Sequence, residues 1–218
     1  YVTGGYQLAK KHQAQYLVPA GVDVAFGDEA FVQAVGGGSQ LHVGGLRVDV
    51  VHTPGHTPHH ISFAVAGADG LGAVFTGGSL LYGTVGRPDL ISPELTVQQA
   101  HDQWHSARRL VAELPASTQI FPTHGFGSFC SSIQTDGRQT SLGEESNINP
   151  ALTQTESDFV TMLLSGLDVF PSYYAHMGPA NAAGPDNIDV TLPRPTSPVE
   201  LRERTGRGEW VEIGRAHV

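Results

Sequence analysis

The stretch from Val50 to Phe63, VVHTPGHTPHHISF, constrains the fold of this chain more than any other. Apolar residues lead into a Thr53-Pro54-Gly55 turn, and a second apolar run begins at Ile61. This pattern predicts two short strands joined by a rigid turn that contains three histidines. Because imidazole is the commonest metal ligand at neutral pH, His56 is the first candidate for a metal site.

The rest of the chain alternates predicted strands and helices, which favours a mixed α/β architecture. Its 27 glycines and 14 prolines imply short elements with many turns. Strands are predicted at residues 16–19, at 41–50 as a hairpin with a Gly44-Gly45 turn, and at 61–66, 73–76 and 120–122. Helices are predicted at 4–12, 28–35, 96–114 and 156–167, of which 96–114 has apolar residues at the clearest helical spacing. Residues 79–95 are predicted to be a loop.

Charge and composition exclude several classes of function. The net charge of -9 disfavours binding to nucleic acid or to an anionic membrane surface. The sequence has no run of ~18 apolar residues, so no transmembrane helix is expected. Cys130 is the single cysteine, which rules out an internal disulfide framework and favours a cytoplasmic protein. We expect a small molecule as partner, and the sequence leaves open whether the chain forms a homodimer.

Potentially reactive residues also follow other predicted strands. These are the Gly77-Gly78 pair, Arg87 with Asp89, and His124. Strand ends that meet at one edge of a sheet are common positions for functional sites. For His56 and His124 the alternative is a histidine that only bonds the backbone of its turn. Arg87 and Asp89 are equally compatible with a salt bridge that fixes the loop and with a substrate contact.

The remaining histidines favour structural roles. His52 precedes the turn on a different face, and His59 and His60 are expected at the surface or in support of His56. His101 and His105 have the i, i+4 spacing that can hold zinc. No glutamate stands beside them in the required place, so we expect them on a covering helix.

Four segments in this order resemble the metallo-β-lactamase superfamily: TPGHTPHHISF, VFTGGSLLYGTVGRPDL, IFPTHGFG and EESNINPALTQTESDF. Within it they are most similar to the glyoxalase II and persulfide dioxygenase branch, including forms fused to a rhodanese domain. The resemblance implies a four-layer αββα sandwich, an α/β (α+β) fold that is truncated here at its N-terminus. It also implies a metal-dependent hydrolase of glutathione thioesters, or an iron-dependent dioxygenase of glutathione persulfide in sulfur metabolism.

The resemblance assigns roles to particular residues. His56 matches a metal ligand, and His124 matches a ligand of a second metal or a hydrogen-bonding group near the first, with Fe(2+) or Zn(2+) as the metal. Arg87 and Asp89 match a loop that supports the active-site wall and are candidate catalytic residues. Tyr173, Tyr174 and His176 lie where relatives approach the substrate.

Two departures from the family pattern affect the expected activity. The His-x-His-x-Asp-His ligand motif is expected immediately before Tyr1, so we expect the chain to be an inactive fragment. Relatives have Phe-Thr-Gly-Asp where this chain has Phe75-Thr76-Gly77-Gly78, which replaces a ligand carboxylate by glycine. His59 or His60 is the candidate to compensate. The alternative function is a non-catalytic scaffold or sulfur-transfer partner with a decayed metal site.

The same comparison predicts the domain organisation. Residues 1–185 are predicted to form a partial metallo-β-lactamase-like domain, and 186–197 a linker. From about residue 178 Pro, Gly and Asn become frequent, which predicts a surface tail or linker there. A helix start at Ser197-Pro198 and the Glu209-Trp210-Val211 segment resemble the entry to a rhodanese module, so 198–211 is predicted to begin a truncated second domain. Residues 212–218, EIGRAHV, resemble translated adapter sequence and are predicted to be a non-native tail.

Overall fold

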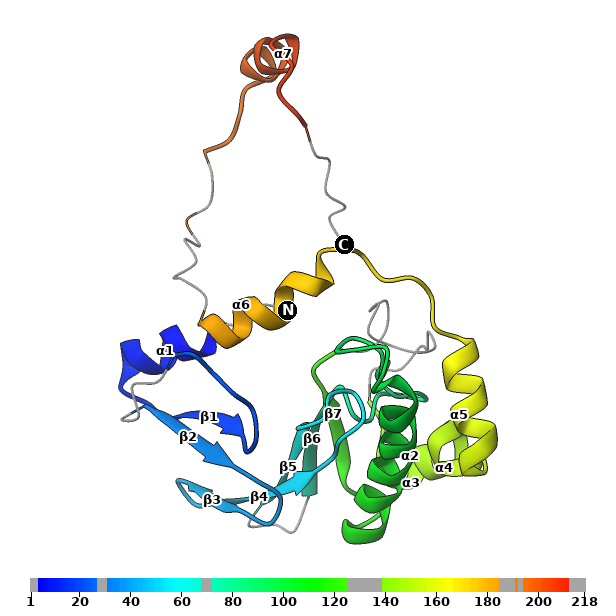
Figure 1. Ribbon diagram of the computed structural model, residues 1–218. Coiled ribbons are helices and arrows are strands. Elements are labelled where there is room, and N and C mark those ends of the chain that lie inside the picture. Colours follow the sequence, from blue (N-terminus) through cyan, green and yellow to red (C-terminus); the bar gives the residue numbers. More distant parts are fainter. Residues whose placement is uncertain are drawn as a thin grey trace. The chain divides into compact units, whose positions relative to one another are not determined.

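The computed structural model describes residues 4–26, 31–67, 72–124, 139–184, 191 and 194–211 (Figure 1). The chain divides into two compact units, Tyr1–Asp186 and Asn187–Val218. Cys130 and the predicted tail at 212–218 lie outside the described residues. None of the described helices is both long and apolar enough to cross a membrane.

A five-stranded sheet forms the centre of the first unit. In spatial order its strands are β3 (Gln40–Val43), β4 (Leu46–His52), β5 (Ile61–Ala66), β6 (Gly72–Gly77) and β7 (Gln119–Pro122). The first four pair antiparallel, and β7 pairs parallel with β6. Val43 faces Leu46 across the Gly44-Gly45 turn, which confirms the predicted hairpin. The parallel pairing brings the ends of β6 and β7 to the same edge.

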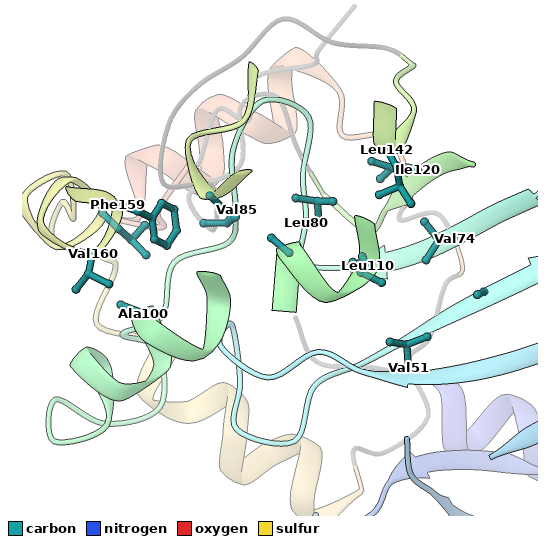
Figure 2. Packing of buried hydrophobic residues seen from close by; sticks show 14 residues of the cluster. Val51, Val74, Leu80, Val85, Ala100, Leu110, Ile120, Leu142, Phe159 and Val160 are labelled. Atoms are coloured by element: carbon teal, nitrogen blue, oxygen red, sulfur yellow. The ribbon is translucent and has the colours of Figure 1, made fainter. Parts of the chain in front are cut away.

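Four helices pack against one another, and their buried side chains join those of one face of this sheet in a single cluster: α2 (Thr96–Glu113), α3 (Leu142–Ile148), α4 (Pro150–Thr153) and α5 (Glu156–Ser165) (Figure 1). Val74 and Ile120 on the sheet share a buried cluster with Leu110 of α2 (Figure 2). The loop after β6 belongs to the same cluster, because Leu80 is 0% exposed and Val85 is 1% exposed. This loop is therefore part of the core, and the backbone that follows Gly78 is held in place.

A smaller sheet lies on the N-terminal side of the unit. β1 (Tyr16–Pro19) pairs parallel with β2 (Val32–Val35). The prediction of a helix at 28–35 was wrong, because Val32–Val35 forms four paired positions with β1. A short apolar run of this kind fits a strand or a helix equally by periodicity. α1 (Gly5–His12) precedes β1 as predicted, and its Tyr6 packs on Phe26 with ring centroids 4.3 Å apart.

Helix α6 (Tyr174–Ala183) runs through the region where a tail was predicted from about residue 178. It contains Pro179 and ends at Gly184, whose φ is +79°. The backbone N–H of Ala25 donates to the carbonyl of Ala182 over 2.7 Å. The end of α6 is thus fastened to the segment that follows β1.

In the second unit, α7 (Pro198–Gly206) begins as predicted. The Ser197 side chain accepts a hydrogen bond from the N–H of Glu200, and Pro198 occupies the first turn. These are the usual signals of a helix N-terminus. The relation of this helix to a rhodanese module stays a prediction.

The face of the five-stranded sheet opposite α2–α5 carries a row of apolar side chains. Val50, Phe63, Phe75 and Phe121 are paired in register from β4 to β7. Val50 is 2% exposed, whereas Phe75 is 47% and Phe121 45% exposed, with their rings stacked at 5.3 Å. This face is therefore covered at β4 and open at β6 and β7.

Candidate functional site

The histidine turn between β4 and β5 is fixed at its base and at its tip. The N–H of Thr53 donates to the carbonyl of His60 over 2.9 Å, which closes the turn. Gly55 has φ +135°, and a Cβ there would lie 2.6 Å from backbone atoms of Gln103 on α2. Only glycine permits this approach. The turn therefore packs closely against α2, which fixes the position of His56 at the edge of the sheet.

His56 is 9% exposed, and its Nδ1 lies 2.9 Å from the carbonyl oxygen of Arg87. A carbonyl can only accept, so Nδ1 carries the proton and donates, and Nε2 keeps its lone pair. Burial lowers the pKa of His56, which favours the neutral ring. A neutral imidazole with one nitrogen tied to a carbonyl is the arrangement that metal-binding histidines adopt.

His124 follows β7, and its ring centroid lies 5.3 Å from that of His56. The structure thus brings together the two histidines proposed as metal ligands. Nδ1 of His124 contacts the Thr123 hydroxyl over 2.9 Å, while Nε2 is buried with no hydrogen-bond partner among the described residues. Burial, and then the nearby His56, lower the pKa of His124 to about 4. A buried polar atom without a partner costs free energy, and a metal ion would satisfy it.

His60 lies beside them, but both of its nitrogens are in use. Nδ1 lies 2.9 Å from the Thr53 hydroxyl, and Nε2 accepts a hydrogen bond from the N–H of Gly78 over 3.2 Å. Burial, and then the nearby His56, lower the pKa of His60 to about 3. Metal binding by His60 would require loss of the Gly78 hydrogen bond, so its geometry is that of a supporting residue. His59, the other candidate to compensate, is exposed and lies against Gly21.

Arg87 and Asp89 form a salt bridge with two hydrogen bonds, just before the cavity-lining residues Leu90 and Ile91. Nε and Nη2 of Arg87 each donate to a carboxylate oxygen of Asp89 over 2.7 Å. Nη2 also donates to the carbonyl of Asp168 over 2.5 Å, and the guanidinium lies 5.0 Å from the Phe170 ring centroid. The side chain of Arg87 is only 4% exposed. This geometry favours the structural alternative, in which the pair fixes the loop whose carbonyl orients His56.

Glu145 is a second anchor of this loop, and the sequence did not single it out. It is 0% exposed and accepts hydrogen bonds from the Gly83 N–H, the Thr140 hydroxyl and the Asn149 amide over 2.8–2.9 Å. Three donors around an acceptor-only group satisfy a buried carboxylate. It therefore holds the loop to α3.

A cavity of about 390 Å³ opens beside the two candidate ligands. His56 and His124 line this cavity together with Leu90, Ile91 and one face of α6. The lining residues on that helix are Tyr174, Met177, Gly178 and Asn181. Tyr173 is 58% exposed and His176 is exposed, and the described cavity lining includes neither. Of the three residues that the resemblance placed near the substrate, Tyr174 lines the cavity, together with Met177, which the sequence did not single out.

The described residues supply part of a metal donor set. No group of three or more His, Cys, Asp or Glu side chains among them is arranged to hold a metal ion. Two neutral imidazoles converge, one with an unpartnered buried nitrogen. Residue 78, where the resemblance places a ligand carboxylate, is glycine. The pair suits a metal, and a complete centre needs donors beyond the described residues.

Comparison with known proteins finds relatives in sequence and in fold. No family model matches the chain. The chain is 26% identical to a mitochondrial persulfide dioxygenase, ETHE1, of Mus musculus over 162 residues, which are 73% of this chain and 51% of that protein. It is 37% identical to a hydroxyacylglutathione hydrolase of Tolumonas auensis over 95 residues, 42% of this chain and 32% of that protein. The chain thus spans about half the length of the first of these curated relatives and about a third of the second.

Two solved structures share the fold. A metallo-β-lactamase from Staphylococcus aureus matches with a TM-score of 0.76 at 26% identity, over 90% of this chain and 58% of that one. ETHE1 from Myxococcus xanthus matches with a TM-score of 0.67 at 26% identity, over 84% of this chain and 72% of that one. These matches confirm the predicted mixed α and β fold class. Through these homologues and structural neighbours, the chain belongs to the metallo-β-lactamase superfamily.

Proposed function

We propose that this chain is part of a metal-dependent enzyme that acts on a thioester or a persulfide of a glutathione-type thiol. His56 and His124 are its metal ligands, with Zn(2+) or Fe(2+) as the metal. The observation that carries the proposal is the buried, unpartnered Nε2 of His124 beside the oriented ring of His56. The two curated relatives reported above carry the names of a persulfide dioxygenase and a hydroxyacylglutathione hydrolase, which supports this choice of substrate class.

The chain's own residues hold the site in shape for this chemistry. A bound metal supplies a Lewis acid that polarises a carbonyl or lowers the pKa of water. The Arg87 carbonyl keeps the proton of His56 on Nδ1, so Nε2 is available as a donor atom. Leu90, Ile91 and Met177 give the cavity an apolar wall that holds the sulfur-bearing group and excludes water.

The second candidate function is a scaffold or sulfur-transfer partner without catalysis. It is supported by Gly78 and by the lack, among the described residues, of a third side chain placed to complete a metal centre. The rhodanese-like start predicted near Ser197 is compatible with either function. Metal content separates the two candidates.

The test is a titration of this chain with Co(2+), whose absorption reports on its ligands, followed by elemental analysis after dialysis. We expect one cobalt per chain, with an affinity that falls at least about tenfold in His124→Ala. His59→Ala is the matched control, because that histidine is exposed, and it should bind as the unchanged protein does. Absence of bound metal would support the scaffold, whereas equal affinity in the two variants would show that His124 is not a ligand. Turnover is measured on the full-length parent as oxygen uptake with glutathione persulfide and as hydrolysis of a glutathione thioester.

A further inference from the structure

We infer that the absence of side chains at Gly77 and Gly78 leaves the space that the imidazole rings of His60 and His56 occupy. Gly78 is then a positioning residue for His56, and its role is more than the loss of the carboxylate that relatives have there. The inference rests on the proposed function only in treating His56 as a metal ligand. The donor set that this backbone permits is then built from imidazoles, without a carboxylate at residue 78.

The ring of His56 occupies the space where a side chain at residue 78 would begin. An ideal Cβ on Gly78 would overlap Cδ2 of His56, and it would lie 2.5 Å from Nε2 and 2.7 Å from Cγ. Nonbonded carbon atoms pack at about 3.5–4.0 Å. Any side chain at residue 78 must therefore displace the imidazole.

Gly86 confines the His56 ring from another side. A Cβ there would lie 2.6 Å from Nδ1 and 2.9 Å from Cγ of His56. The N–H of Gly86 also donates to the carbonyl of Gly78 over 3.0 Å, which ties the two glycines together. The His56 ring has no room to move toward Gly86. If a side chain at residue 78 displaced the ring, the hydrogen bond from His56 to the Arg87 carbonyl would therefore break.

The preceding glycine does the same for His60. Gly77 has φ +56°, and a Cβ there would lie 2.5 Å from Nε2 of His60. The next peptide N–H, that of Gly78, donates to this same nitrogen over 3.2 Å. Two consecutive residues without side chains thus set two rings whose centroids lie 6.2 Å apart.

A carboxylate introduced at residue 78 would bring an oxygen donor and displace a nitrogen donor. The structure therefore favours a metal that imidazole binds well, such as zinc, copper, nickel or iron, over magnesium or calcium. Gly78→Asp should fail to improve the site, although the aspartate would match the pattern of relatives.

The experiment compares Gly78→Ala and Gly78→Asp with the unchanged chain, and it uses Gly45→Ala as control, since a Cβ at Gly45 meets nothing within 4 Å. Zinc affinity is measured by calorimetry, and the protonated nitrogen of His56 is identified without metal by long-range ¹H–¹⁵N NMR. We expect both substitutions at residue 78 to weaken zinc binding about tenfold and to remove the Nδ1–H signature of His56. Gly45→Ala should change neither.

A comparison in the His56→Ala variant keeps the test valid if the variants at residue 78 fold poorly. In His56→Ala the ring is absent, so adding Gly78→Ala there should shift the urea midpoint far less than it does in the parent chain. Equal shifts in the two backgrounds would overturn the inference. So would zinc binding that is tighter in Gly78→Asp and unchanged in Gly78→Ala. If the unchanged chain binds no zinc, the proposed function fails, whereas the NMR and midpoint comparisons still decide the role of Gly78.

Discussion

Two arginine–aspartate pairs at the same spacing give a matched test of what fixes the site wall. Arg87 and Asp89 have side chains that are 4% and 16% exposed, whereas those of Arg47 and Asp49 are 55% and 31% exposed. Arg87→Met removes the two charged hydrogen bonds to Asp89 and the hydrogen bond that Arg87 donates to the Asp168 carbonyl. Arg47→Met removes an ion pair that water largely replaces.

The structure sets the size of each effect. Breaking a buried ion pair on one side costs about 3–5 kcal/mol, and partial access of water to Asp89 favours the lower end, about 3 kcal/mol. An exposed pair contributes less than about 1 kcal/mol. With a urea dependence of about 2 kcal/mol per molar, Arg87→Met should lower the unfolding midpoint by roughly 1 M more than Arg47→Met.

Urea titration followed by circular dichroism measures both midpoints on the same chain. Arg87→Lys should resemble Arg87→Met, because an ammonium cannot reproduce two parallel bonds to a carboxylate. If Arg87→Met shifts the midpoint no more than Arg47→Met does, the pair does not fix the wall, and a direct substrate contact becomes the better explanation of Arg87.

Three further predictions use other parts of the unit. Replacing Phe75 and Phe121 by threonine should reduce self-association in analytical ultracentrifugation without unfolding the chain, because it removes an exposed apolar patch; unchanged association would refute this. Burial lowers the pKa of His60 to about 3 and that of His124 to about 4. In the unfolded chain histidine has a pKa of about 6.5, so below that pH the unfolded state binds more protons than the folded state. Stability should therefore fall as the pH drops from about 6.5 toward 4 and should not change above 6.5. Urea titrations at pH 7.5, 6 and 5 measure this, and greater stability at pH 5 would refute it. Glu145→Gln should destabilise the fold, since its amide would point a donor at other donors; the thermal midpoint measures this, and Glu144→Gln at the exposed neighbour is the control.

Much of the fold followed from local patterns. The apolar spacing of residues 96–114 predicted α2, and the alternation around Gly44-Gly45 predicted the β3–β4 hairpin, because both signals lie within one element. Helix α3 was missed although Ser141 and Glu144 form a capping box that the sequence already contained. Strand β2 was assigned to a helix because its partner, β1, is separate in sequence.

The candidate site was predictable only where its residues end strands. His56 and His124 were placed together because strand ends meet at a sheet edge. Tyr174 was expected near the substrate from the resemblance, but Met177 and the helical cavity wall were not, since α6 contains Gly178 and Pro179 and carries no clear apolar period. The tautomer of His56 depends on the Arg87 carbonyl, a contact that no local pattern encodes.

The contacts that shape the site join residues far apart along the chain, which bears on when the site forms during folding. His56 and Arg87 are separated by 31 positions, Gly83 and Glu145 by 62, and Arg87 and Asp168 by 81. Contacts of such long range require closure of large loops and form late in folding. The two imidazoles should therefore come together only after α3 and the segment beyond α5 have docked, so metal uptake would report the last step of folding.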